Sequence, residues 1–176
     1  MEIEISRRKK AGWLTVIKLK NILTSNKVSP TVKAQIYDTH VLPTMTYGAE
    51  TWNTTEREEY KLSTIQRKMK RKMTEIKMRD RTTNTELRTR SKVKDIIEII
   101  YESKRRWAGH IARRYDNRWT KRVTEWRPFQ YPRPRGRPPT RWCDPIVKLY
   151  GRTWMRKAQC RTEWRRCDLR NWRADY

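Results

Sequence analysis

Charge is the sequence feature that most limits what this chain can fold into. Its 176 residues include 44 Lys and Arg but only 19 Asp and Glu, a formal net charge of +25. Only about one residue in six is Leu, Ile, Val or Phe, so disorder competes seriously with folding. Nine Trp, eight Tyr and six Met supply other large side chains for a core. We therefore expect a marginally stable, Trp-rich helical protein of about one domain's length.

The sequence also limits where such a chain would work. No stretch approaches the roughly 20 consecutive apolar residues that cross a bilayer, and the start is charged where a signal peptide needs an apolar segment. Three cysteines, Cys143, Cys160 and Cys167, lack the spacing of a disulfide framework or a zinc site, which predicts buried or half-buried thiols. We expect no membrane partner, no secretion, and a nuclear location or a cytoplasmic ribonucleoprotein.

Apolar residues recur at helical spacing near the start of the chain. Residues 12–25 are predicted to form an amphipathic helix whose inner residues are Trp13, Leu14, Ile17, Leu19, Ile22 and Leu23. Ser29 followed by Pro30 is typical of the start of a second helix, which Pro43 is expected to end. The predicted inner face of this second helix consists of Val32, Ile36 and His40. Residues 44–53 are expected to form a turn or a short extended piece.

Two Thr-x-x-Glu pairs, Thr55 with Glu58 and Thr83 with Glu86, have capping-box spacing and predict two more helix starts. The first of these helices has a predicted inner stripe of Leu62, Ile65, Met69, Met73 and Ile76. A long helix is predicted from about residue 92 to 114, with the inner residues Val93, Ile96, Ile97, Ile100, Trp107, Ala108 and Ile111. We expect Trp107 to pack in the core, and His110 to be a hydrogen-bonded packing residue.

Two of these helices carry dense basic runs. On the first of them the candidates for phosphate contact are Arg67, Lys68, Arg71 and Lys72, and Lys70 lies within the same basic run. On the long helix the candidates are Arg105, Arg106, Arg113 and Arg114. Arg outnumbers Lys by 27 to 17, and a guanidinium group both binds phosphate and stacks on bases. This excess favours a nucleic-acid partner, whether DNA, RNA or a hybrid duplex. The competing interpretation is that these cations form a solvated face without a partner. The helix dipole also favours Arg in the last turns of the long helix, so stability alone explains part of its charge pattern.

The helical pattern breaks in the stretch RPFQYPRPRGRPPT, which predicts an extended, polyproline-like linker over residues 127–141. The linker separates a predicted helical domain, residues 1–126, from a helical tail, residues 142–176. In the tail we expect a short helix over 142–150 and then a last helix capped by Thr153. One face of that last helix would carry Trp154, Ala158, Trp164, Leu169 and Trp172.

The linker also contains PRGRP, which resembles the core of an AT-hook. In that family the Gly, here Gly136, lets the backbone lie close to the floor of a narrow minor groove. The resemblance assigns Arg135 and Arg137 to the groove, and it assigns Arg133 and Arg141 to phosphates. The basic residues usual after the core are replaced here by Pro and Thr, and an Arg- and Pro-rich linker can also contain such a string without that function.

Four stretches, in this order, together resemble one family: VLPTMTYGAETW (41–52), RRWAGHIARRYDNRWTKRVTEW (105–126), GRPPTRWCDPI (136–146) and WMRKAQCRTEWR (154–165). They look like the region after the palm in reverse transcriptases of non-LTR retrotransposons (LINEs), most closely the RTE (BovB-like) clade, and the likeness covers roughly residues 7–172. The resemblance implies a helical thumb and a C-terminal extension that grip a template–primer duplex. It also implies the palm and fingers of a parent enzyme as a further partner.

The sequence lacks the side-chain sets typical of catalysis. The seven Asp include no adjacent pair that could hold two metal ions, and no Gly-rich phosphate loop is present. In the family that the chain resembles, the catalytic Asp pair lies in the palm and the endonuclease lies further upstream. Pro145 stands where the family often has an acidic residue.

We therefore expect an all-α, thumb-like fragment that binds nucleic acid, is not an enzyme by itself, and uses no cofactor, metal or small molecule. Two alternatives remain open from the sequence. One is a stand-alone, AT-hook-type DNA-binding protein of chromatin. The other is a helical relic without a selected partner.

Overall fold

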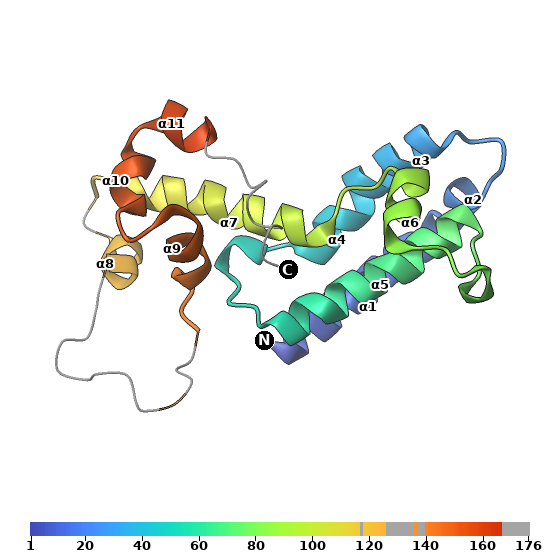
Figure 1. The fold of residues 1–176 in the computed structure, drawn as a ribbon, viewed down its shortest axis with the longest axis horizontal. Coiled ribbons are helices and arrows are strands. Elements are labelled where there is room, and N and C mark those ends of the chain that lie inside the picture. Colours follow the sequence, from blue (N-terminus) through green and yellow to red (C-terminus); the bar gives the residue numbers. More distant parts are fainter. Residues whose placement is uncertain (117, 126–135, 137–139, 167–176) are drawn as a thin grey trace. The chain divides into compact units, whose positions relative to one another are not determined.

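The structure is a computed structural model that describes residues 1–116, 118–125, 136 and 140–166 (Figure 1). These residues form helices and no strand, which confirms the predicted all-α class. They divide into an N-terminal unit, residues 1–49 and 54–100, and a C-terminal unit, residues 50–53 and 101–176. The sequence predicted a boundary at residue 126, where the Pro- and Arg-rich linker begins. In the structure the later turns of the long helix pack with residues of the tail, so they belong to the C-terminal unit. Most of the predicted linker lies outside the described residues.

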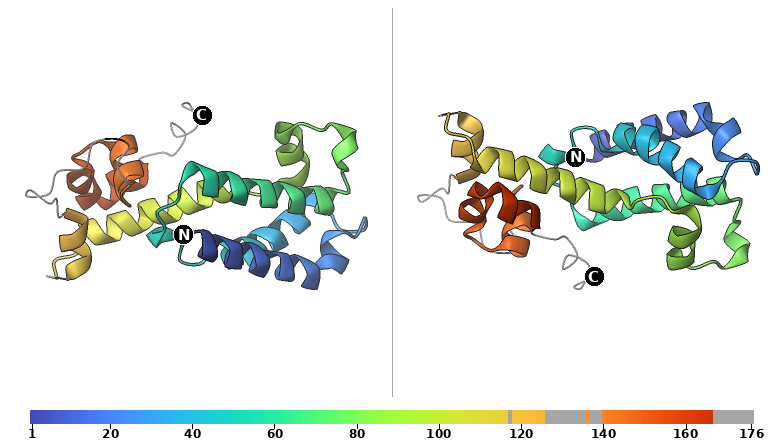
Figure 2. Two further views of the ribbon diagram at one scale, coloured as in Figure 1. Left: turned by 90° about the horizontal axis from the view of Figure 1, so that it is seen from below. Right: turned by 90° about the horizontal axis from the view of Figure 1, so that it is seen from above.

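The N-terminal unit is built from two long helices and several short ones. In chain order they are α1 (Glu2–Lys18), α2 (Lys20–Leu23), α3 (Pro30–Ile36), a π-helical turn (Tyr37–Val41), α4 (Leu42–Thr46), α5 (Glu56–Thr74), a 3-10 turn (Met78–Asp80) and α6 (Asn84–Ser91). Between α4 and α5 a further 3-10 turn (Ala49–Thr51) begins in this unit, and its last two residues belong to the C-terminal unit. Helix α1 packs on α4 and α5, and α6 packs on α5 and α3. Figures 1 and 2 show α1 and α5 side by side.

Both predicted capping boxes are present. The Thr55 side chain accepts a hydrogen bond from the Glu58 backbone N–H while the Glu58 carboxylate accepts one from Thr55, and Thr83 and Glu86 do the same at the start of α6. The inner stripe of α5 is also confirmed at its centre, because Leu62, Met69 and Met73 are buried. The other two members of that stripe, Ile65 and Ile76, are half-buried, and Ile76 lies just beyond the end of α5.

The inner face of α1 differs from the predicted one. The helix begins at Glu2, ten residues earlier than expected, and the buried residues of α1 and α2 are Ile5, Gly12, Val16 and Leu23. Leu14, Ile17 and Ile22 are exposed instead. The reason lies at Gly12, where a Cβ atom would overlap the side chain of Met45. Helix α4 approaches α1 closely at this glycine, so the glycine side of the helix faces inward and the more apolar side does not.

Pro43 does not end the helix that starts after Ser29. The Ser29 side chain caps α3 as predicted by accepting from the Val32 N–H, but the helical chain then continues to Thr46. A π-helical turn precedes Pro43, and within it the Leu42 N–H bonds the Tyr37 carbonyl five residues back. This wider turn changes the bonding pattern where proline has no N–H to donate, so the chain passes the proline without stopping. The turn also changes the inner face: Ala34, Tyr37 and Val41 are buried, whereas Val32 and His40 are exposed.

The C-terminal unit surrounds the later part of α7. Its helices are α7 (Ile96–Ala112), which begins in the N-terminal unit, α8 (Trp119–Glu125), α9 (Asp144–Tyr150), α10 (Trp154–Gln159) and α11 (Arg161–Arg166). Its core consists of Ala108, Ala112, Ile146, Tyr150, Trp154, Ala158 and Trp164. The predicted inner face of the last helix is therefore confirmed at Trp154, Ala158 and Trp164, while Leu169 and Trp172 lie outside the described residues.

One predicted helix is two helices in the structure. The backbone of Cys160 is extended, with φ −80° and ψ 109°, and it separates α10 from α11. Thr153 stands at the N-cap of α10 but makes no side-chain cap hydrogen bond there. This break changes the direction of the chain, so Trp154 and Trp164 reach the same core from separate helices.

The structure also describes His110 and two of the three cysteines. His110 is exposed, so the prediction that it packs was wrong. Cys143 is half-buried as predicted, Cys160 is exposed contrary to the prediction, and Cys167 lies outside the described part. Within that part, no helix is long and apolar enough to cross a bilayer, and no group of three His, Cys, Asp or Glu could hold a metal ion.

Candidate nucleic-acid interface

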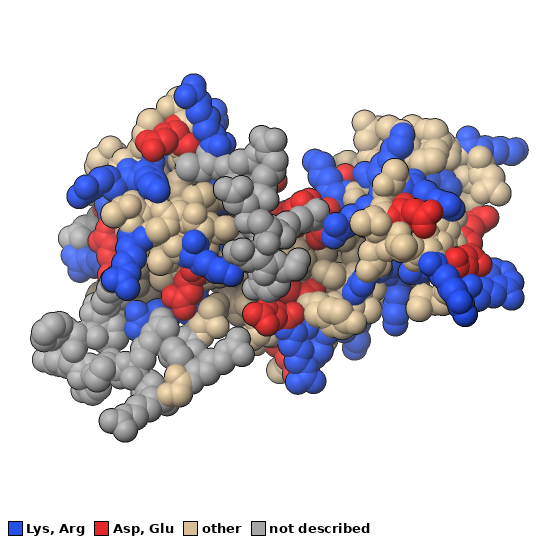
Figure 3. All heavy atoms as spheres, viewed as in Figure 1, with Lys and Arg blue, Asp and Glu red and all other residues tan. Residues whose placement is uncertain are grey.

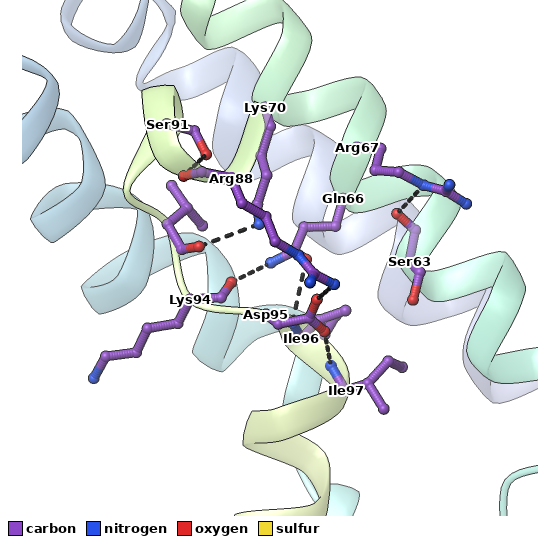
Figure 4. A network of polar contacts seen from close by, with 11 residues as sticks. Ser63, Gln66, Arg67, Lys70, Arg88, Ser91, Lys94, Asp95, Ile96 and Ile97 are labelled. Carbon is purple, nitrogen blue, oxygen red and sulfur yellow. Dashed lines mark hydrogen bonds and ion pairs between the residues drawn. The ribbon is translucent and has the colours of Figure 1, made fainter. Parts of the chain in front are cut away.

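Two polar side chains on α5 are buried and fix the connection between α6 and α7 (Figure 4). The Lys70 ammonium donates to the Val93 carbonyl over 3.2 Å, and the Gln66 amide donates to the Lys94 carbonyl over 2.7 Å. The Gln66 carbonyl oxygen accepts from the Ile96 N–H over 3.2 Å. Burial lowers the pKa of Lys70 to about 8. Lys70, expected on the basic face, therefore belongs to the interior.

The two candidate arginines of α5 are occupied by local contacts. The half-buried Arg67 guanidinium donates to the Thr64 hydroxyl over 3.0 Å and lies 5.5 Å from the centre of the Tyr60 ring. The half-buried Arg71 guanidinium donates to the Thr82 carbonyl over 3.4 Å, which holds the chain between α5 and α6. Both guanidinium groups therefore already have partners within the N-terminal unit.

Lys68 and Lys72 of α5, in contrast, are exposed. Glu2 of α1 forms an ion pair with Lys61, and the Lys72 ammonium lies 5.7 Å from the centre of the Trp13 ring. Each of these pairs joins residues 59 positions apart, so the two helices run parallel in a constant register. The same offset of 59 positions relates Lys9 of α1 to Lys68 of α5.

Two lysines of α1 extend this basic surface. Lys9 and Lys10 line a hollow of about 510 Å³ together with Ser6, Trp13, Leu14 and Ile17, and no acidic residue is among the described residues that line it. We define Lys9, Lys10, Lys68 and Lys72, together with Trp13, as the α1/α5 basic patch. Lys9 and Lys10 were not among the predicted candidates, because only tertiary packing brings α1 against α5.

Arg105 of α7 and Arg113, which follows the last residue of that helix, connect it to the C-terminal helices. The Arg105 guanidinium donates to the Trp164 carbonyl over 2.6 Å, and the Arg113 guanidinium donates to the Ala158 carbonyl over 2.7 Å. Burial and the neighbouring cations Arg161 and Arg165 lower the pKa of Arg113. Both arginines therefore hydrogen-bond to the helices that pack on α7 and help to hold them in place.

The other two candidates are Arg106 of α7 and Arg114, which follows the helix and is half-buried. Arg106 is exposed and pairs with Glu102 over 3.5 Å. The Arg114 guanidinium lies 5.9 Å from the centre of the Trp107 ring. Lys and Arg side chains are spread over the visible face of each unit (Figure 3), so charge alone does not select one site.

Most of the AT-hook-like segment lies outside the described residues, including Arg133, Arg135 and Arg137. Gly136 is exposed and has φ +103°, a backbone conformation that favours glycine. Arg141 is half-buried, and its backbone N–H donates to the Asp144 carboxylate over 2.7 Å near the start of α9. Arg141 also lines a cavity of the C-terminal unit.

The C-terminal unit contains a cavity of about 720 Å³ that we call the Trp-lined cavity. Four of its lining residues are tryptophans: Trp107, Trp119, Trp142 and Trp154. The Trp142 indole is fixed because its N–H donates to the Glu50 carbonyl over 2.7 Å. Trp107 is half-buried in the cavity wall, so the prediction that it packs in the core was wrong. Its neighbours Ala108 and Ile111 face the core, and Trp107 lies on the flank of the helix beside them.

Comparisons with known proteins add one relationship. No protein-family model matches the chain, and no solved structure matches it. A Caenorhabditis elegans protein described as "Putative uncharacterized transposon-derived protein" is 35% identical to it over 149 residues. The match covers 82% of this chain and 53% of the relative, so the chain spans about half the length of the curated relative that it matches. Over most of its own length, the chain is therefore similar to a transposon-derived protein.

Proposed function

We propose that this chain is a non-catalytic, nucleic-acid-binding segment that corresponds to the thumb and C-terminal region of a non-LTR retrotransposon reverse transcriptase. Its role would be to grip a template–primer duplex. The observation that carries the proposal is the α1/α5 basic patch: Lys9 and Lys10 line one hollow with Trp13, and the Lys72 ammonium lies 5.7 Å from the centre of the Trp13 ring. The similarity to a transposon-derived protein supports the same function class.

The chemistry of the patch indicates what it would contact. A lysine ammonium is a compact charge on a long stem, and it binds a phosphate without reading the base sequence. Lys68 and Lys72 lie four residues apart on α5, so one helical turn separates them along the same face. We therefore propose that the patch holds backbone phosphates of a duplex with little sequence preference.

Neutralising two lysines of the patch tests this proposal. We expect Lys68→Gln with Lys72→Gln to weaken duplex binding about tenfold or more near 100 mM salt, because two phosphate contacts are lost. The slope of log affinity against log salt should fall in magnitude by about two, as measured by fluorescence anisotropy at several salt concentrations. Both side chains are exposed, so the thermal melt should remain that of the wild type.

A matched control removes the same charge elsewhere in the N-terminal unit. Lys27→Gln with Lys94→Gln also changes two exposed lysines, and neither belongs to the patch. We expect this control to bind more tightly than the patch variant and to keep a steeper salt dependence. Equal affinities for the two variants would contradict a duplex site at the patch.

The PRGRP motif allows a direct test of the AT-hook alternative. We expect Arg135→Ala with Arg137→Ala to weaken A·T-rich and G·C-rich duplexes about equally, because the proposed grip contacts phosphates. Competition binding with the two duplexes measures this ratio. Selective loss of a preference for the A·T-rich duplex would instead favour minor-groove binding by the motif.

A further inference from the structure

The Trp-lined cavity has features that a grip on duplex phosphates does not use. Trp119 is 75% exposed, although it belongs to the cavity wall, and Trp107 is half-buried beside it. Trp154 is buried, and Trp142 is anchored through its indole N–H. Two rings are thus held rigidly by the fold, while two others present open surface to the cavity.

Cations surround these rings. The Arg122 guanidinium lies 5.6 Å from the centre of the Trp119 ring, and the Lys104 ammonium lies 5.6 Å from that of Trp142. Arg141 and Arg152 also line the cavity, and Glu125 is the one acidic residue among its described lining residues. With Arg114 beside Trp107, the cavity combines an aromatic wall with a strongly basic surround.

This combination fits a ligand in which a flat, weakly polar ring is joined to an anionic group. A nucleotide of a single strand is such a ligand, because its base stacks on an indole and its phosphate attracts guanidinium groups. A base inside a duplex cannot reach the cavity, since both of its faces are already stacked. The volume of about 720 Å³ falls within the usual range of about 300–1,000 Å³ for ligand pockets.

We propose that the Trp-lined cavity binds unstacked bases of a single-stranded nucleic acid. Trp119 and Trp107 are the stacking surfaces, and Arg114, Arg122 and Arg152 attract the strand's phosphates. The inference rests on the proposed function, since it names a second form of nucleic acid that the same chain holds. It adds a single-strand site in the C-terminal unit to the duplex site of the N-terminal unit.

Trp119→Ala tests the site, with an oligothymidylate and a blunt-ended duplex as separate probes. We expect the variant to bind the oligothymidylate about tenfold more weakly, within a range of roughly 5- to 100-fold, because one stacking surface is lost. Duplex affinity should change less than about threefold, and the thermal melt should be unchanged because the side chain is exposed. Trp119→Phe should recover part of the single-strand affinity, since a phenyl ring still stacks.

Tyr115→Ala is the matched control. Tyr115 is 94% exposed on the same unit and is not among the described residues that line the cavity, so its removal should leave both affinities unchanged. Single-strand binding by Trp119→Ala equal to that of the wild type would overturn the inference, and so would an equal loss of both affinities. A wild-type chain that binds the duplex but not the oligothymidylate would overturn the inference alone. A chain that binds neither probe would overturn the proposed function as well.

Discussion

Replacing Trp164 by Ala is expected to destabilise the C-terminal unit by about 3–5 kcal/mol, which is a large part of the stability of an ordinary domain. The indole is 3% exposed and packs on Tyr150 and Trp154, with ring centres 4.7 Å and 6.2 Å away. Its N–H donates to the Arg105 carbonyl over 3.0 Å, so the substitution also removes a buried hydrogen bond. Few aliphatic side chains are available to close the void that remains.

The backbone of α7 is shaped around the same ring. A Cβ atom at Gly109 would lie 2.6 Å from the Trp164 indole nitrogen, so glycine lets the ring lie directly against the helix. This close fit offsets the local weakening that glycine causes in a helix. Without the indole, α7 would keep the destabilising glycine and lose the contact for which it makes room.

Thermal and urea unfolding followed by circular dichroism measure the effect. We expect the melting midpoint of Trp164→Ala to fall by about 10 °C or more. Trp119→Ala is the matched control, because it makes the same chemical change at a side chain that is 75% exposed. If Trp164→Ala melts together with Trp119→Ala and the wild type, the packing described for the C-terminal unit is wrong.

Local signals predicted the helix starts well. The boxes at Thr55 and Thr83 form as expected because the bonding groups lie three residues apart in the chain, and no distant residue is needed. The inner face of α1 was mispredicted because Gly12, which has no apolar side chain, is the point of closest approach to Met45. The prediction that Pro43 ends the helix was also wrong, because the helical chain continues through a π-helical turn for which the sequence has no clear signal.

The basic candidates show what cannot be predicted from a run of charges. Arg105 and Arg113 have hydrogen-bond partners 59 and 45 residues away, and those contacts depend on how the tail packs. Lys70 lies within a run of cations in the sequence, but its ammonium reaches the buried Val93 carbonyl, 23 residues later. The Trp-lined cavity was missed because its four tryptophans come from separate segments that only tertiary packing brings together.

Duplex affinity is expected to fall by about 10³- to 10⁵-fold when the salt concentration rises from 50 to 200 mM. Each phosphate that a Lys or Arg neutralises releases condensed counterions, so the loss grows with the number of contacts; this range corresponds to about six to ten of them. The net charge of +25 and the basic surface of each unit supply enough cations for that number. A grip made of lysines offers little apolar contact that salt would leave intact.

Equilibrium titration of the full chain with a labelled duplex, repeated across this range of salt, tests whether the chain binds nucleic acid through phosphate contacts. We expect a straight line of log affinity against log salt, with a slope of about −5 to −9. An affinity that does not change with salt, or no binding at 50 mM salt, would contradict it.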